Sequence, residues 1–368
     1  MEKEIREKIL SGKSVGALPV DALLITNPAN MRYTAGFTGE GYVYLSEKKA
    51  MVVTDSRYTL AAAKECPEFQ VVEWDKKGYY YPLSEFLQEE GLQTLGMEDE
   101  SVTVAEYEKL QKELEKAGAK VKIKGIGDGI TKHRAVKSAE EIACIRRAEA
   151  IGDRAFERLL SIVQMGMTEK QAAAWLEFFL KEEGADGLSF DTIAASGIHS
   201  AMPHAVPTNK PLESGDFLTL DFGCRYRGYC SDMTRTLVMG KASDRQKEIY
   251  DTVLRAQERA LAGIRPGMSG KEVDALARDV IREAGYGDCF GHSLGHSLGL
   301  DIHEKPAFSP KEDTIIQPGM VITVEPGVYI EDFGGVRIED VVVITEAGCE
   351  NITHSSKEFI EIMRSADV

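Results

Sequence analysis

The sequence predicts a mixed α/β (α+β) protein of two domains, residues 1–128 and 129–368, in which the second domain is built from two related halves. Three observations predict this fold class. The chain of 368 residues is longer than most single hydrophobic cores. Short apolar strands and helices with apolar residues at helical spacing occur along the chain. The second domain also contains an internal repeat.

The first domain has the pattern of a small α/β unit. Strands are expected at 22–25, 43–45, 51–54 and 69–74, and helices at 57–66 and 106–117. A polar cluster is interpreted as loop capping rather than as a substrate edge: Asn27, Asn30, Arg32 and Tyr33. This domain contains no histidine and no convergent set of carboxylates, so we expect the chemistry to lie in the second domain.

A glycine-rich segment, Gly125–Gly129, is the best candidate for the linker between the domains. Just after it, Ser138 and Glu141 form an S-x-x-E capping box before a run of apolar residues. This pattern marks the start of the first long helix of the second domain.

The second domain repeats itself at a shift of 101 positions. The matched residues of the first copy are Arg154, Ala155, Glu157, Arg158, Leu160, Gly166, Met167 and Lys170. In each copy a helix runs into a Gly-Met turn, and a second helix follows with its own capping box, Thr168 with Gln171 and Ser269 with Glu272. Further on, SGDFLTLDFG (214–223) resembles PGMVITVEPG (318–327). We therefore predict a duplicated helix-helix-strand unit with pseudo-twofold symmetry.

Each copy also predicts a hairpin that carries two acidic residues. Expected strands lie at 217–222 and 232–239 around a turn at 223–228, and at 321–325 and 336–344 around 327–335. The four carboxylates, which face one axis in this arrangement, are those of Asp221, Asp232, Glu325 and Glu339. Asp221 and Glu325 lie in apolar runs, where a carboxylate is almost always paired or bound to a metal. For any single one of them a salt bridge is an equal alternative.

Three of the seven histidines, His292, His296 and His303, fall in one stretch, GHSLGHSLGLDIHE at 291–304. Histidine is the commonest transition-metal ligand, and the interleaved glycines allow a close approach of backbone and ligand. Four carboxylates with imidazole suit Mn²⁺, Fe²⁺, Co²⁺ or Zn²⁺, and their charge favours two ions ~3.5–4 Å apart over one. Such a pair activates a bridging water, so the site predicts hydrolysis of an unreactive bond such as an amide.

Composition excludes several other classes of function. The net charge of -16 and the pI near 5.1 argue against nucleic acid or a membrane surface as partner. No window approaches the ~18 apolar residues of a membrane span, and the N-terminal MEKEIREKIL has no apolar signal region. The six cysteines are scattered without a CxxC pair and are interpreted as reduced thiols. We expect a cytoplasmic protein.

Five motifs of the second domain resemble those of the pita-bread (M24) metallopeptidases, namely methionine aminopeptidase, aminopeptidase P and prolidase. The motifs are LDFG (220–223), SDMTRT (231–236), GHSLGHSLGLDIHE (291–304), TVEPG (323–327) and GGVRIED (334–340). The resemblance implies a curved antiparallel sheet between duplicated units. It also implies five metal ligands, Asp221, Asp232, His296, Glu325 and Glu339, with Asp232 and Glu339 bridging two ions. Mn²⁺ is the first expectation for the metal, with Co²⁺, Zn²⁺ or Fe²⁺ as alternatives.

The resemblance implies catalytic and substrate-binding roles as well. His204 and His303 are expected to hydrogen-bond the substrate carbonyl or the oxyanion. Glu325 is expected to carry a proton from the bridging water to the leaving nitrogen. His292 and Arg337 match positions of the proline-specific branches, and Tyr329 is expected to shape the same pocket. The remaining histidines, which receive no role and are expected on loops or the surface, are His133, His199 and His354.

The first domain, through GFTGEGYVYLS and TDSRYTLAA, resembles the creatinase/prolidase amino-terminal domain, which implies a homodimer. The substrates implied are short peptides with proline at the second position. The first hypothesis is therefore an Xaa-Pro aminopeptidase, and its close alternative is an Xaa-Pro dipeptidase with the same metals. A third hypothesis, from another class, is a metal-free binding protein or creatinase-like enzyme on the same fold.

Overall fold

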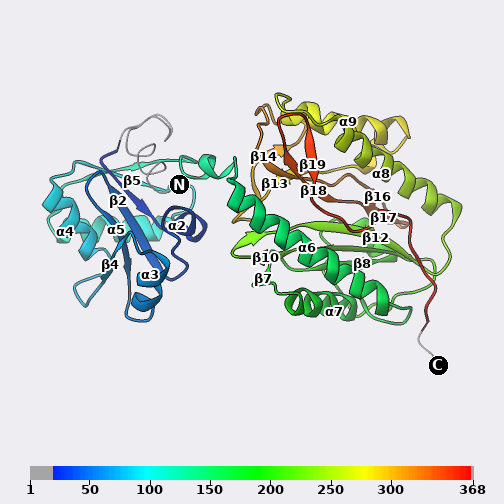
Figure 1. Cartoon of the computed structure of the whole chain (residues 1–368), viewed down its shortest axis with the longest axis horizontal. Coiled ribbons are helices and arrows are strands. Elements are labelled where there is room, and N and C mark those ends of the chain that lie inside the picture. The colour runs from blue at the N-terminus through cyan, green and yellow to red at the C-terminus, as the bar shows by residue number, and fades with distance from the viewer. Residues whose placement is uncertain (1–19, 366–368) are drawn as a thin grey trace. The chain divides into compact units, whose positions relative to one another are not determined.

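The computed structural model describes residues 20–365, and the chain divides into two compact units, residues 1–134 and 135–368 (Figure 1). The N-terminal stretch for which we expect no signal region lies outside the described residues. Within the described part of the chain, no helix has the length and apolar character needed to cross a membrane.

Unit 1 is built on a six-stranded mixed sheet with the order β4-β3-β2-β1-β5-β6. Strands β1, β2 and β3 are antiparallel neighbours, whereas β4, β5 and β6 each run parallel to the strand beside them. The strands are β1 (Ala22–Ile25), β2 (Gly41–Ser46), β3 (Ala50–Thr54), β4 (Gln70–Glu73), β5 (Thr94–Met97) and β6 (Lys122–Gly125). The helices are α2 (Pro28–Ala35), α3 (Thr59–Glu65), α4 (Tyr81–Glu90) and α5 (Val104–Lys116), followed by the 3-10 helix η1 (Thr131–Arg134).

Alternate residues of β1 enter two separate cores, as the period of a strand requires. Leu23 packs in a cluster with residues of α2 and α3, while Leu24 packs in a second cluster with residues of α4 and α5. The sheet of unit 1 is therefore covered by helices on both faces. The strands and helices expected in this unit overlap β1–β4, α3 and α5, and the structure adds α2, α4, β5 and β6.

For the polar cluster in unit 1, the capping interpretation is confirmed for Asn27, whereas Asn30, Arg32 and Tyr33 lie within α2. Asn27 is the N-cap of α2, and its side chain accepts from the Asn30 backbone. Asn30 in turn donates to the buried Glu98 carboxylate, with its Nδ2 2.6 Å from Oε1.

Unit 2 contains two long helix pairs, α6 (Ala139–Ile162) with α7 (Glu169–Glu182), and α8 (Asp244–Gly263) with α9 (Gly270–Glu283). Each of the predicted capping boxes, at Ser138, Thr168 and Ser269, is present with both reciprocal hydrogen bonds. Gly166 and Gly267 take φ of 85° and 90°, a left-handed conformation that suits glycine, so the Gly-Met turns of the two copies match.

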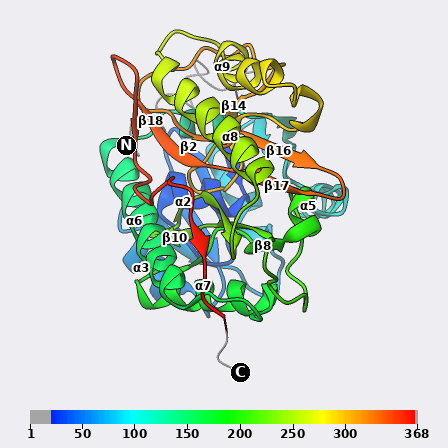
Figure 2. The ribbon, with the colours of Figure 1, turned by 90° about the vertical axis from the view of Figure 1, so that its right-hand side faces the viewer.

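Two sheets carry the duplicated strands. One has the order β20-β12-β9-β8 and the other β14-β13-β15-β18-β19. Their antiparallel cores, β8-β9-β12 and β13-β15-β18, correspond to each other. Apolar residues of α6 and α7 pack with those of β9 and β12, and those of α8 and α9 pack with β15 and β18, so the strands lie between the helix pairs (Figures 1 and 2).

The strands and 3-10 helices of unit 2 have the following bounds, given in chain order. In the first half they are β7 (Gly187–Leu188), β8 (Ile193–Ser196), η2 (Gly197–Ala201), β9 (Phe217–Phe222), β10 (Cys224–Tyr226), β11 (Tyr229–Cys230) and β12 (Met233–Met239). In the second half they are η3 (Gly287–Cys289), β13 (Gly295–Ser297), β14 (Glu304–Phe308), β15 (Val321–Val324), β16 (Gly327–Ile330), β17 (Gly334–Arg337), β18 (Asp340–Ile344), β19 (Cys349–Asn351) and β20 (Glu361–Ile362).

The second hairpin differs from its prediction in one respect. The single strand expected at 336–344 is broken at Ile338 and Glu339 into β17, which pairs with β16, and β18, which pairs with β15. The break arises because the Glu339 N–H donates to the Thr234 carbonyl of the first hairpin, at 3.1 Å, instead of continuing either ladder. In the first hairpin the expected turn at 223–228 likewise contains the short strand β10.

Candidate active site

The two hairpins present their acidic residues in corresponding ways. Asp221 lies near the end of β9, and Glu325 directly follows β15. Asp232 is the second residue of the two-residue gap between β11 and β12, and Glu339 is the second residue of the gap between β17 and β18. The duplication therefore delivers one pair of carboxylates from each half of unit 2.

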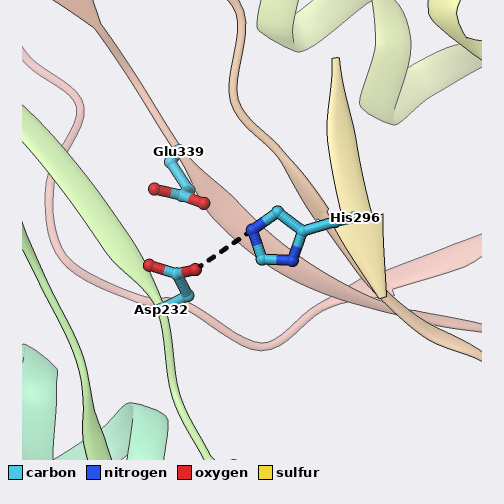
Figure 3. Close-up of side chains that lie close together, drawn as sticks. All are labelled: Asp232, His296 and Glu339. Carbon is cyan, nitrogen blue, oxygen red and sulfur yellow. Dashed lines mark ion pairs between the residues drawn. The ribbon is translucent and has the colours of Figure 1, made fainter. Parts of the chain in front are cut away.

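His296, on β13, completes this cluster. Its Nε2 lies 3.5 Å from Asp232 Oδ2 and 3.5 Å from Glu325 Oε1. Ligand atoms of Asp232, His296 and Glu339 all lie within 4.8 Å of one another, and their side chains point toward a common centre (Figure 3). This spacing would allow the three side chains to share a metal ion.

Strand β13 reaches this position because it carries glycine beside the histidine. A Cβ at Gly295 would meet the Thr323 carbonyl oxygen at 1.9 Å, closer than any side chain can come. The Thr323 hydroxyl then links two members of the cluster. It accepts from the His296 N–H at 3.0 Å and donates to Glu325 Oε1 at 3.2 Å.

Arg337 contacts two further carboxylates of the cluster, Asp221 directly and Glu339 through Thr234. Its Nη2 lies 2.6 Å from Asp221 Oδ2, and its Nε donates to Thr234 Oγ1, which donates to Glu339 Oε2 at 2.6 Å. The other oxygen of Asp221, Oδ1, is buried and has no hydrogen-bond partner among the described residues. A buried carboxylate oxygen of this kind is costly unless a cation occupies the space beside it, so the donor set fits a divalent metal.

All five residues predicted as metal ligands line one cavity of about 510 Å³. The predicted residues His204, His292, His303 and Arg337 line it as well. Its wall also includes apolar residues, among them Phe190, Ile193, Ala205, Val206, Ile302 and Ala307. Tyr329 lies behind this wall, where its hydroxyl is 2.9 Å from His292 Nε2 and accepts from Arg337 Nη1 at 2.8 Å.

Comparison with known proteins decides the family. Residues 143–346, more than half of the chain, match the model of metallopeptidase family M24, and residues 13–136 match the creatinase/prolidase N-terminal domain. The chain belongs to metallopeptidase family M24. Membership of a metallopeptidase family makes this M24 protein a hydrolase and implies divalent metal ions.

Several relatives of this M24 peptidase match it over almost its full length. An Xaa-Pro dipeptidase of Pyrococcus furiosus is 40% identical over 97% of this chain and 100% of its own. A solved structure of an Xaa-Pro dipeptidase from Bacillus anthracis has a TM-score of 0.93 and 42% identity, covering 98% of this chain and 100% of the other. An X-Pro aminopeptidase from Thermotoga maritima has a TM-score of 0.89 and 39% identity, covering 96% and 99%.

The M24 site concentrates groups whose protonation is strongly perturbed. Burial raises the pKa of Asp232 to about 6 and that of Glu325 to about 7, and burial together with the other carboxylates raises the pKa of Glu339 well above its ordinary value. Burial lowers the pKa of His296, but its contacts with Asp232 and Glu325 outweigh burial and raise it to about 9. Without a cation, carboxylates buried this close together thus hold their protons more tightly than they would in water.

The neighbouring histidines are shifted the other way. Burial, aided by Arg337, lowers the pKa of His292 to about 4, and burial also lowers the pKa of His303. Both rings are therefore neutral at pH 7. The His303 ring lies against the His296 ring, with centroids 4.4 Å apart.

Sequence reasoning missed three residues that support the cluster. Thr234 and Thr323 orient the carboxylates as described, and both lie inside recognised motifs, SDMTRT and TVEPG. Glu149 accepts from the Asp232 backbone N–H at 2.9 Å and from the Thr353 hydroxyl at 2.9 Å. Its one signal in the sequence is an acid on the buried face of an amphipathic helix.

The three histidines without an expected role lie apart from the cavity lining. His133 is in η1 of unit 1, and the His354 N–H donates to the Asp153 carboxylate. His199 lies in η2, where its Nδ1 is 3.2 Å from the buried Glu169 carboxylate.

Proposed function

We propose that this M24 peptidase is an Xaa-Pro aminopeptidase that removes the N-terminal residue of peptides with proline in second position. The relatives named above support the Xaa-Pro bond as the target, since each carries a name for that specificity. The choice of an aminopeptidase rests on one observation: most N–H groups of Arg337 are already bonded within the protein.

Arg337 is the one lysine or arginine among the described residues that line the cavity. A guanidinium has five N–H donors, and four are used, by Thr234, Tyr329, Asp221 and the Pro203 carbonyl. His292 and His303 are neutral at pH 7. A dipeptide would bring the free carboxylate of its proline into this cavity, where the charge of Arg337 is already paired with Asp221 and, apart from the proposed metal ions, no further lysine or arginine of the described lining can meet it. An incompletely paired buried charge is costly. A longer peptide presents a neutral amide there.

The metal ligands proposed are Asp221, Asp232, His296, Glu325 and Glu339, holding two divalent ions, with Mn²⁺ as the first candidate. The unpartnered Asp221 oxygen and the four carboxylates support this set. When bound, such ions lower the pKa of a water toward about 7 and polarise the scissile carbonyl. Two ions also balance the negative charge that four carboxylates would otherwise leave in one cavity.

The protein's own groups complete the chemistry. His204 and His303 donate hydrogen bonds to the substrate carbonyl oxygen as it gains negative charge. Glu325 accepts a proton and delivers it to the proline nitrogen, which is a poor leaving group until protonated. The apolar wall receives the proline ring, and the His292–Tyr329–Arg337 chain of hydrogen bonds fixes the shape of the pocket.

A second candidate is an Xaa-Pro dipeptidase, which is favoured by the names of two of the relatives described above. The homodimer and the cytoplasmic location predicted from the sequence stay predictions. Light scattering of the purified chain would test the first of these.

A peptide-length series with added Mn²⁺ tests the proposal. We expect Xaa-Pro-Xaa tripeptides to be hydrolysed with a higher kcat/KM than Xaa-Pro dipeptides, and Xaa-Ala-Xaa tripeptides to be poor substrates. Cleavage of dipeptides alone would replace the aminopeptidase proposal with the dipeptidase. Failure to cleave any Xaa-Pro peptide would refute both.

A further inference from the structure

His204 is carried by an exposed loop that needs to be held in place. We call residues 197–207, between β8 and Thr208, the His204 loop. It contains η2 and presents Ile198, Met202 and Val206 to solvent, with relative exposures of 56%, 52% and 78%. Apart from Ala205, which packs with Ile193 and Ala195, apolar side chains contribute little to the position of the loop, so polar contacts largely fix it.

Glu169 accepts hydrogen bonds from the residues that flank this loop. Its carboxylate, the side chain of the first residue of α7, has no exposure to solvent. Oε1 accepts from the Ser196 backbone N–H at 2.7 Å and from the Ser196 hydroxyl at 2.8 Å. Oε2 accepts from the Thr208 backbone N–H at 2.9 Å and from the Thr208 hydroxyl at 2.6 Å. One carboxylate thus binds both ends of the His204 loop, and His199 Nδ1, within the loop, lies 3.2 Å from the same Oε1.

Two further contacts fix the middle of the loop. The Ser200 hydroxyl accepts from the Gly335 N–H at 2.8 Å, and the Pro203 carbonyl accepts from Arg337 Nη1 at 3.3 Å. Both partners belong to β17, which leads to Glu339. Glu169 therefore holds the two ends of the His204 loop, and β17 holds its middle.

In the second half of unit 2 a carboxylate from a loop takes the corresponding place. Glu312 Oε1 accepts from the Thr314 backbone N–H at 3.0 Å and from the Thr314 hydroxyl at 2.5 Å. At the shift of 101 positions the counterpart of Glu169 is Gly270. The first backbone N–H of α9 still donates to the Thr314 carbonyl, just as that of α7 donates to the Lys210 carbonyl. A Cβ at Gly270 would meet the Ala307 carbonyl oxygen at 2.2 Å, so no side chain fits there. Only in the half that carries His204 is this carboxylate supplied by the first residue of the helix, where it reaches both ends of one loop.

We propose that Glu169 is a positioning residue for His204. By fixing Ser196 and Thr208, the carboxylate sets where the loop enters and leaves the cavity wall, and so where the His204 ring meets the substrate. The inference rests on the proposed function, in which His204 contacts the substrate carbonyl.

A double-mutant cycle tests the coupling. We expect Glu169→Gln to lower kcat on an Xaa-Pro-Xaa peptide by about 10- to 100-fold, with KM within about threefold, because a small displacement of a catalytic group costs rate more than binding. In a His204→Ala background the same change should lower kcat by less than about twofold. Glu177→Gln, on the same helix but two turns away, is the matched control and should leave kcat unchanged.

Hydrogen exchange, measured in two variants, keeps the test independent of activity. Hydrogen exchange of residues 197–207 should be faster in Glu169→Gln and in the milder variant Thr208→Val. Exchange of residues 298–311 should stay as in the wild type. Equal losses of kcat in both backgrounds, or unchanged exchange of the loop, would overturn the proposal. If the wild type cleaves no Xaa-Pro peptide, the proposed function fails by itself, and the exchange result still decides whether Glu169 holds the loop.

Discussion

Glu325 lies where β15 ends, in contact with the Thr323 hydroxyl and the His296 ring. In the protein without metal ions, burial raises the pKa of this carboxylate to about 7, whereas bound cations would favour its charged form. The two effects oppose each other, so the group can both accept and release a proton. The same group faces a cavity large enough for a peptide end. Its surroundings, rather than its residue type, therefore suit it to proton transfer.

We expect Glu325→Gln to lower kcat by about 10²- to 10⁴-fold, the usual contribution of a general acid–base group. An amide retains the size of the side chain but cannot accept and deliver the proton. Steady-state kinetics on an Xaa-Pro-Xaa peptide would measure the loss. Glu331→Gln, an exposed glutamate after β16, should behave as the wild type. A Glu325→Gln variant with wild-type kcat would remove Glu325 from the mechanism.

Among single residues, the sequence could predict those whose type differs sharply from that of their neighbours along the chain. Asp221 and Glu325 interrupt apolar runs, and His296 lies between glycines, so their convergence on one cavity could be anticipated. Glu149 could not be found, because an acid on one helix reveals its contact with a distant backbone N–H only after folding. The engagement of Arg337 with Asp221 depends likewise on the register of two hairpins.

The two hairpins are joined beneath the cluster by a buried ion pair. Arg235, in β12, donates to the carbonyls of Thr234 and Glu339 and to the Asp340 carboxylate. The second oxygen of Asp340 accepts from Gln257 of α8, from Asn351 of β19 and from Lys357. This network ties β12 to β18 directly behind the two gap residues, Asp232 and Glu339.

We expect Asp340→Asn to destabilise the protein by about 3–5 kcal/mol, because the change leaves the buried Arg235 without its counter-charge. Urea denaturation would measure the difference. The exposed Asp313→Asn, in the same half of unit 2, is the matched control and should change stability by less than about 0.5 kcal/mol. A loss that is no larger for Asp340→Asn than for Asp313→Asn would contradict the role given to this network.

The Glu169 contacts predict a dependence of stability on pH. Burial raises the pKa of Glu169, but the hydrogen bonds from Thr208 and Ser196 outweigh burial and hold it below its ordinary value of 4.5. The stabilisation from Glu169 is therefore complete above the unfolded-state pKa and is lost as pH falls through the folded-state pKa. The gap in unfolding free energy between the wild type and Glu169→Gln, about 1–3 kcal/mol at pH 7, should shrink as the pH falls below 4.5. Urea denaturation across this range would measure it, and a constant or growing gap would contradict the assignment.

The elements show why part of the second hairpin was predicted wrongly. Residues 336–344 alternate apolar and charged side chains up to Glu339 and end in an apolar run, a pattern that suits one strand. The backbone instead leaves the ladder at Glu339, because its N–H finds the Thr234 carbonyl of the other hairpin. A pattern of hydrophobicity cannot reveal such a long-range partner, although it is this break that turns Glu339 toward Asp232.

At the scale of the whole molecule, the duplication determines where the chemistry lies. Each half of unit 2 supplies a helix pair, a hairpin and two carboxylates, and its matched capping boxes and Gly-Met turns were visible in the sequence. Unit 1 was predicted less completely. Helix α2 and helix α4 are short and begin with proline near their first position, so neither shows a sustained helical period.

Metal binding tests the central claim most directly, since the account requires acidic residues from both halves of unit 2 to hold two ions together. The measurement is the number of Mn²⁺ ions bound per chain, determined by elemental analysis after equilibrium dialysis of the purified protein. We predict two ions per chain for the wild type and for Asp313→Asn, and fewer than two for Asp232→Asn and for Glu339→Gln. A wild-type chain that binds no divalent ion, or variants of Asp232 and Glu339 that still bind two, would contradict the account.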